Sequence, residues 1–222
     1  MTRHLAITMG DPAGIGPEII VKAAARLKDR LDSGKLKLTI IGSGPALQLA
    51  EQQLGIGIEI PETGMESDWP NLCFIQADTE GEPILPGELS ADGGRMAFKA
   101  IEKGVQLALS GKIGGIVTAP LNKEALNKAG FHYAGHTELL AELTGARGSV
   151  MMLAHGNMRV SHVTTHVALE DVPKRLTPER LRLVIDLTHK ALKNLGIANP
   201  KIAVAALNPH AGEGGLFGRQ DI

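Results

Sequence analysis

The order of strand-like and helix-like segments is the feature that most constrains the fold of this chain. Short runs rich in β-branched residues alternate with longer amphipathic stretches along most of the sequence. Strands are predicted at 4–9, 36–42, 71–77, 114–120 and 201–207, and helices at 19–31, 45–55, 91–112, 122–130, 137–145 and 177–196. This alternation predicts an α/β fold with a mostly parallel sheet.

One stretch departs from the alternation and predicts antiparallel strands. In 149–169, two strand-like runs flank the turn sequence "HGN". The core of either sheet must be aliphatic, because only 3% of the residues are aromatic while 43% are hydrophobic. An aliphatic core suits helix-on-sheet packing better than an aromatic-rich β-sandwich.

Charge and composition exclude several classes of protein. The 23 basic and 24 acidic residues leave a net charge of −1, so no basic footprint for nucleic acid is present. No apolar run is long enough to cross a bilayer, and the apolar part of the N-terminus is too short for a signal peptide. The single cysteine, Cys73, is expected to be a buried thiol. We therefore expect a cytoplasmic protein that binds neither nucleic acid nor membrane.

The loops that follow the predicted strands are where a ligand is expected, because open α/β sheets bind ligands beyond the carboxyl ends of their strands. These loops begin at Gly10, Ala119, His166 and Asn208. The first, "MGDPAGIGPE", lacks the full G-x-G-x-x-G dinucleotide pattern because position 19 is Ile. A simple tight turn, with Pro17 in the first helical turn, explains this loop as well as a dinucleotide-binding role does.

Three of the eight histidines stand out: His162, His166 and His210. If the run "VSHVTTHVAL" is a strand, His162, Thr164 and His166 share one face; a helix would also align them, but the β-branched residues favour the strand. His166 and His210 each follow a predicted strand and could converge on one sheet edge as metal ligands. A structural role remains the alternative for each, since a catalytic site usually needs three protein ligands.

The pair His136 and Thr137 precedes a predicted amphipathic helix. Thr137 suits a helix N-cap, and Glu138 suits the positive end of the helix dipole. The same arrangement of free N–H groups, hydroxyl and imidazole also suits an anion site. Both interpretations remain open from the residues alone.

Five motifs in order, "MGDPAGIGPE", "VTAPLNK", "GHTE", "TTH" and "LNPHAGEGG", resemble the 4-hydroxythreonine-4-phosphate dehydrogenase (PdxA) family over essentially the whole chain. "GDPAGIGPEI" also looks like an expanded form of the "GDGIGPEI" opening of isocitrate and isopropylmalate dehydrogenases. The resemblance implies their two-domain α/β/α sandwich, with a mostly parallel sheet and some antiparallel strands. It places a first, nucleotide-side domain at 1–130 and a second domain, with substrate and metal residues, at 131–222.

The resemblance also implies an activity and its site residues. The family oxidises the 3-hydroxyl of a 4-phosphorylated hydroxy acid with NAD or NADP and a divalent metal (Zn, Mg, Mn or Co), giving a 3-keto acid that decarboxylates. The substrate is 4-phosphooxy-L-threonine in pyridoxal phosphate (pyridoxine) biosynthesis, or 4-phospho-D-threonate or 4-phospho-D-erythronate in carbohydrate catabolism. The carried-over residues are His136 and Thr137 for substrate and His166 and His210 for metal, in a homodimer with its active site near the interface.

The resemblance leaves part of the site unaccounted for. Complete members of the family continue well beyond residue 222, and that part supplies the third metal ligand, phosphate-binding residues and much of the nucleotide site. We therefore expect a C-terminally truncated chain that is inactive by itself. The alternative is an inactive fragment or a non-catalytic binding or assembly module of the same fold.

Overall fold

The computed structural model describes residues 3–64, 69–80, 84–133 and 135–222. The chain divides into two compact units, 1–146 and 147–222, which are described one at a time. The expected division after residue 130 stays a prediction about the domains of the family fold.

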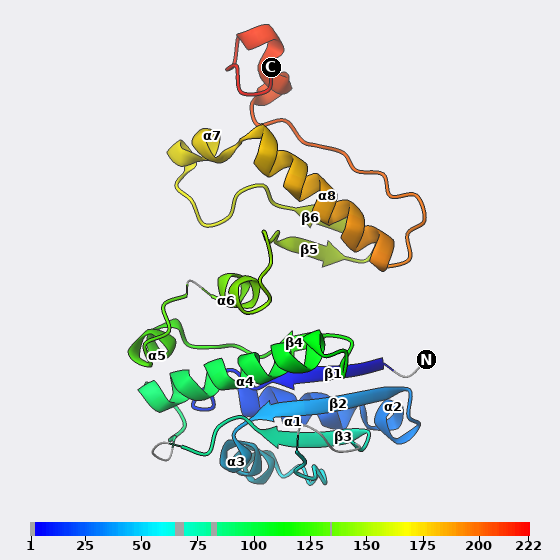
Figure 1. Cartoon of the computed structure of the whole chain (residues 1–222), viewed down its shortest axis with the longest axis vertical. Helices are drawn as coiled ribbons and strands as arrows, with labels where there is room; N and C mark the ends of the chain where they lie inside the picture. Colours follow the sequence, from blue (N-terminus) through cyan, green and yellow to red (C-terminus); the bar gives the residue numbers. More distant parts are fainter. Residues whose placement is uncertain (1–2, 65–68, 81–83, 134) are drawn as a thin grey trace. The chain divides into compact units, whose positions relative to one another are not determined.

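The first unit is built on a four-stranded parallel sheet (Figure 1). The strands are β1 (Arg3–Thr8), β2 (Leu36–Gly42), β3 (Leu72–Gln76) and β4 (Ile116–Thr118), in the order β3-β2-β1-β4. Thr8 at the end of β1 is in register with Ile41 of β2 and with Thr118 of β4. The predicted parallel sheet is confirmed, and the loops after β1 and β4 leave it side by side.

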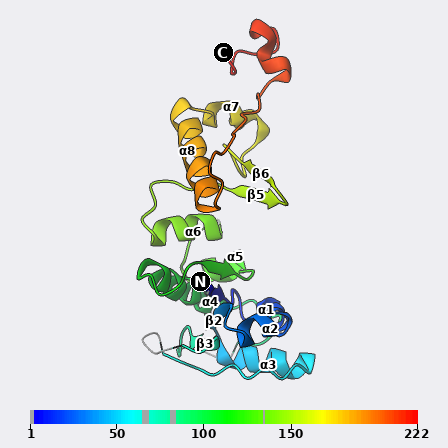
Figure 2. The ribbon, with the colours of Figure 1, turned by 90° about the vertical axis from the view of Figure 1, so that its right-hand side faces the viewer.

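Helices cover both faces of this sheet (Figure 2). The helices of this unit are α1 (Gly16–Arg26), α2 (Lys28–Asp32), α3 (Gly44–Leu54), α4 (Ala91–Leu109), α5 (Lys123–Lys128) and α6 (His136–Leu143). Ile20 and Val21 of α1 and Leu47 of α3 pack with β1 and β2 on one face. On the other face, Met96 and Ala100 of α4 pack with residues of the same sheet.

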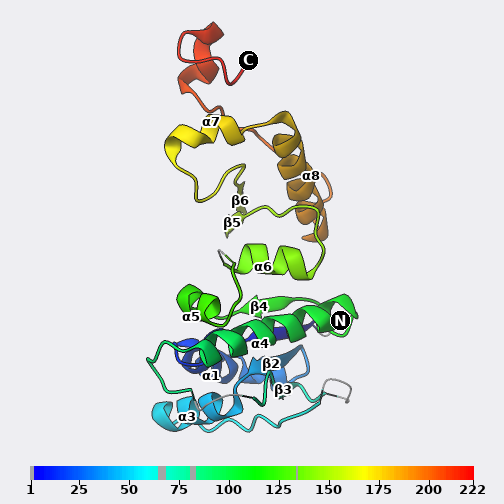
Figure 3. The same ribbon diagram turned by 60° about the vertical axis from the view of Figure 1, so that its left-hand side comes forward.

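Helices α5 and α6 also pack against α4 (Figure 3). Phe98 and Ile101 of α4 form a buried cluster with Leu126 of α5 and Leu139 of α6. This cluster makes α6 part of the first unit. In the described part of the chain, no helix combines the length and the apolar character needed to cross a membrane.

The second unit contains an antiparallel hairpin and one long helix. Strands β5 (Met152–His155) and β6 (Met158–Ser161) pair across a two-residue turn, as predicted. The other elements are the 3-10 turn η1 (Leu169–Asp171), α7 (Val172–Arg175), α8 (Pro178–Asn194) and the 3-10 segment η2 (Pro209–Gly215). The predicted start of α8 is confirmed, because the Thr177 hydroxyl accepts the Arg180 N–H at 3.2 Å.

Two strand predictions in this unit are wrong. Residues 201–207 form no strand, and Val204 within them is 58% exposed. A strand is stable only when its backbone groups pair with a neighbour, and no strand among the described residues pairs with this run. Similarly, β6 ends at Ser161, so His162, Thr164 and His166 do not share a strand face. The backbone pairing goes one step further, from the His162 N–H to the Met151 carbonyl, and then stops.

Candidate functional site

Two loops meet at the carboxyl edge of the parallel sheet. The loop after β1 passes through Gly10, whose φ of +71° lies in the left-handed region. The Asp11 N–H donates to the Pro120 carbonyl, at 3.1 Å, in the loop after β4. A side chain at position 10 would place its Cβ 2.1 Å from that carbonyl oxygen. Glycine at this position therefore allows the two loops to lie in contact.

The contact places the Asp11 carboxyl in a largely buried position. Asp11 is 5% exposed, and its Oδ1 accepts the Ala13 N–H at 3.0 Å. The N-terminal turn of α4 lies against it, since a Cβ on Gly93 would come within 2.8 Å of Oδ1. Burial raises the pKa of Asp11 because it disfavours the charged form, and the hydrogen bond from the Ala13 backbone opposes that rise.

The loop after β4 contributes an amide and an ammonium group. Asn122 caps α5: its Oδ1 accepts the Glu124 N–H at 2.9 Å and the Ala125 N–H at 3.2 Å. The next residue, Lys123, is exposed and makes no hydrogen bond or ion pair with the described residues. The amide is therefore committed to the helix, while the ammonium group is available to a ligand.

The two loops line one side of an open cavity of about 550 Å³. Its lining residues are Asp11, Gly14, Ile15, Pro120, Leu121, Asn122, Lys123 and Glu124. A cavity of this size lies within the range of about 300–1,000 Å³ that is usual for small-molecule sites.

His136 begins α6 beside the end of β4. Its Nε2 is buried without a partner among the described residues. Burial lowers the pKa of His136, and the backbone of Ala119, the first residue after β4, opposes this shift. The neutral imidazole is thus favoured, with one ring nitrogen left for a ligand.

The N-terminus of α6 differs from the sequence expectation for Thr137. The N-cap is Gly135, which makes no side-chain hydrogen bond, and Thr137 is not the cap but lies within the first turn. The predicted capping role of Thr137 is therefore wrong. The aliphatic part of Lys123 lies near this turn, because a Cβ on Gly135 would be 3.9 Å from Lys123 Cε.

The two expected metal ligands lie on exposed loops of the second unit. His166 and His210 each have a φ of 55°, a backbone conformation that residues other than glycine rarely adopt. Ala211 and Glu213, which follow His210, also have positive φ. Strained conformations of this kind occur often at functional sites. The described residues contain no group of three His, Cys, Asp or Glu side chains that could hold a metal ion.

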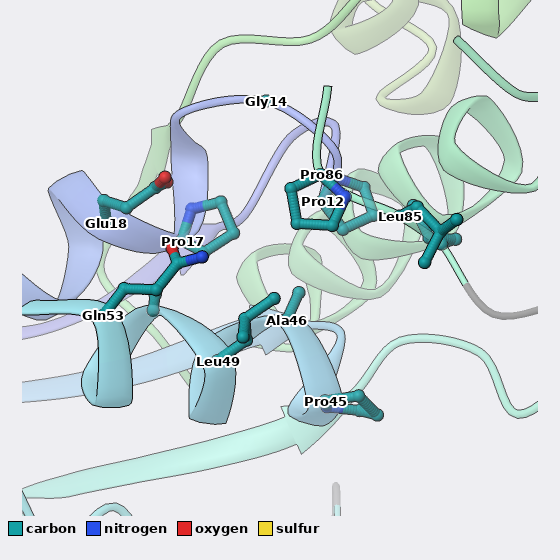
Figure 4. Close-up of a pocket in the computed structure, with 12 residues that line it drawn as sticks. Pro12, Gly14, Pro17, Glu18, Pro45, Ala46, Leu49, Gln53, Leu85 and Pro86 are labelled. Carbon is teal, nitrogen blue, oxygen red and sulfur yellow. The ribbon is translucent and has the colours of Figure 1, made fainter. Parts of the chain in front are cut away.

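A second, smaller cavity lies on the other side of the loop after β1 (Figure 4). It measures about 130 Å³ and is lined mainly by proline and aliphatic side chains from this loop, α1, α3 and residues 84–86. Figure 4 shows Pro12, Leu85 and Pro86 together, with Leu49 and Gln53 projecting from α3. This volume is below that of usual ligand sites, so the cavity lined by Asp11 and Lys123 is the better candidate of the two.

Sequence reasoning anticipated one part of this site and missed another. It singled out His136 but assigned no role to Asp11 or Lys123. The available signal was a carboxylate two residues after a predicted buried strand, in the loop that opens a helix.

Comparison with known proteins gives consistent matches. Residues 18–222 match the family model described as "Pyridoxal phosphate biosynthetic protein PdxA". The chain is 73% identical, over 222 residues, to a Bradyrhizobium diazoefficiens protein provisionally named D-threonate 4-phosphate dehydrogenase, covering all of this chain and 64% of that protein. It is 43% identical over 224 residues to the 4-hydroxythreonine-4-phosphate dehydrogenase of Beijerinckia indica, covering 98% of this chain and 64% of that enzyme.

Solved structures agree with these matches. The crystal structure of a 4-hydroxythreonine-4-phosphate dehydrogenase from Burkholderia phymatum has a TM-score of 0.83 and 37% identity, covering all of this chain and 67% of that one. A terephthalate 1,2-cis-dihydrodiol dehydrogenase from Burkholderia xenovorans has a TM-score of 0.67 and 28% identity, with coverage of 100% and 67%. The chain therefore spans about two thirds of the length of the proteins it matches.

Proposed function

This chain belongs to the PdxA family, and we propose that the protein oxidises the 3-hydroxyl of a 4-phosphorylated hydroxy acid with NAD or NADP. D-threonate 4-phosphate is the first candidate substrate. The observation that carries this choice is the 73% identity, over all 222 residues, to a protein provisionally named for that substrate. 4-Hydroxythreonine 4-phosphate is the second candidate, because relatives named for it are 43–44% identical.

His136 and Thr137 are proposed to contact the substrate. The support for His136 is its buried Nε2, which has no partner among the described residues, in an imidazole whose pKa is lowered by burial. A neutral imidazole can orient a hydroxyl or phosphate oxygen through a ring nitrogen that has no partner in the protein. Thr137 supplies a hydroxyl one residue along the same helical turn.

His166 and His210 are proposed as two ligands of a divalent ion: Zn, Mg, Mn or Co. Exposed imidazoles on conformationally strained loops suit this role, but two donors are fewer than the three that catalytic metal sites usually have. The described residues contain no group of three such donors, so the third ligand is unassigned. When bound, such an ion acts as a Lewis acid toward the substrate hydroxyl.

The oxidised product is a 3-keto acid, whose carboxylate lies β to the new carbonyl and is readily lost as CO₂. The residues that hold the dinucleotide are unassigned.

We also propose a cytoplasmic homodimer with its active site near the interface. The hairpin β5–β6 supports an association surface, because Leu153 is 56% and Met158 66% exposed.

A steady-state comparison tests the proposal. The full-length gene product is assayed for dinucleotide reduction with D-threonate 4-phosphate and with 4-hydroxythreonine 4-phosphate, each with NAD and NADP. We expect activity with a higher kcat/KM for D-threonate 4-phosphate. A higher kcat/KM for 4-hydroxythreonine 4-phosphate would select the second candidate, and no reduction in any combination would contradict the proposed function.

A further inference from the structure

We infer that the cavity between the loops after β1 and β4 receives the substrate, with Asp11 accepting a hydrogen bond from a substrate hydroxyl and Lys123 pairing with a substrate anionic group. Neither residue belongs to the set carried over from the family resemblance. The inference rests on the proposed function, because a phosphorylated hydroxy acid carries both kinds of group.

Asp11 has acceptor capacity that the protein does not use. A carboxylate can accept about four hydrogen bonds, and the only donor to Asp11 among the described residues is the Ala13 N–H. Its Oδ2 makes no hydrogen bond with these residues. Asp11 lines the cavity, so a ligand bound there can supply the donor that this oxygen lacks.

Lys123 forms no ion pair with the described residues. It occupies the first position of α5, where a positive charge is unfavourable toward the helix dipole. Lys128, in the last turn of the same helix, is instead paired with Glu124 at 3.6 Å. The unfavourable placement of Lys123 becomes favourable once an anion binds beside it.

The two groups are held apart on the wall of one cavity. The described residues include no ion pair between Asp11 and Lys123, although both line the same space of about 550 Å³. A small ligand that carries both a hydroxyl donor and an anion satisfies the two groups together. The contact between Gly10 and Pro120 fixes the backbone that presents them.

Binding measurements on the full-length protein test this inference. Lys123→Met removes the charge and keeps the aliphatic stem, and Asp11→Asn keeps an oxygen for the Ala13 N–H. Titration calorimetry with D-threonate 4-phosphate is expected to show Kd raised about tenfold or more in each variant, the usual size of a charge-assisted hydrogen bond. Lys128→Met, which removes a charge from the same helix outside the cavity, is expected to bind as the wild type does.

Two further readouts identify the anion and exclude a merely structural effect. Added NaCl is expected to weaken substrate binding by the wild type more than binding by Lys123→Met. The reason is that salt screens the pair between Lys123 and the substrate anion, which the variant does not make. Titration with D-threonate, which lacks the phosphate, distinguishes the groups: an unaltered affinity of Lys123→Met for it assigns the phosphate to Lys123, and a reduced one assigns the carboxylate.

Wild-type affinity in either Lys123→Met or Asp11→Asn, with the fluorescence of Trp69 showing a folded first unit, overturns the inference. Failure of the proposed function is a separate result, because it is seen in the wild type as an absence of dinucleotide reduction.

Discussion

Replacing Gly10 by alanine probes the contact that builds the candidate site. The residue has a φ of +71°, and its Cβ would lie 2.1 Å from the Pro120 carbonyl oxygen. The left-handed conformation costs alanine roughly 1–2 kcal/mol. Relief of the clash requires backbone movement, which costs about 1–3 kcal/mol in packed regions. The free energy of unfolding of the first unit should therefore fall by about 2–5 kcal/mol.

Gly111 offers a matched control. Its φ is +72°, and a Cβ added at this position would meet nothing within 4 Å, so Gly111→Ala carries the conformational cost without the clash. This control should lose only about 1–2 kcal/mol. The difference between the two variants measures the close approach of the two loops.

Urea unfolding followed by tryptophan fluorescence reports on the first unit specifically. The chain has a single tryptophan, Trp69, which packs against the core cluster between the sheet and α4. With an m-value of about 2 kcal/mol per molar urea, Gly10→Ala should lower the midpoint by about 1–2.5 M. A midpoint for Gly10→Ala that is no lower than that for Gly111→Ala would refute the loop contact.

The remaining predictions concern charge and metal. Asp11→Asn should stabilise the first unit more at pH 7.5 than at pH 4, because the raised pKa means that ionising this buried carboxyl destabilises the native state as the pH rises above the ordinary aspartate value of about 3.9. Urea midpoints at the two pH values check this, and an equal effect at both contradicts it. His166→Ala and His210→Ala should each deplete the divalent metal that co-purifies with the full-length protein, as measured by atomic emission. As a control, His189→Ala, which replaces an exposed histidine of α8, should leave the metal content unchanged. Equal metal content in all three variants would contradict the assignment of His166 and His210 as ligands.

The sequence was sufficient to predict the parallel sheet and the helices that pack on it in the first unit, because their signals are local. The runs around Ile40 and Phe74 are buried on both faces of a parallel sheet and read as continuous apolar segments. The starts of two helices also depend on residues close in sequence: the Ser90 hydroxyl accepts the Gly93 N–H at 3.0 Å, and Thr177 caps α8. Such features depend on a few neighbouring residues, so pattern and turn chemistry identify them.

The second unit was predicted less well because strands depend on partners elsewhere in the chain. The run at 201–207 has strand-like residues, but nothing among the described residues pairs with it. The same dependence ended β6 at Ser161 and left His166 on a loop.

The candidate site was predicted in part. His136 was identified by its motif, whereas Asp11 and Lys123 gain their significance from the contact between two loops that are more than a hundred residues apart. Neither residue type nor spacing reveals that they line one cavity. The structure was needed to bring them together.

The most direct test of the central claim is the stoichiometry of the reaction with D-threonate 4-phosphate. The full-length protein, supplied with a divalent metal and an excess of the oxidised dinucleotide, is allowed to run to completion while reduced dinucleotide and CO₂ are both measured. We predict one reduced dinucleotide and one CO₂ for each molecule of acid consumed. Consumption of the acid without dinucleotide reduction would contradict the assignment as a dehydrogenase.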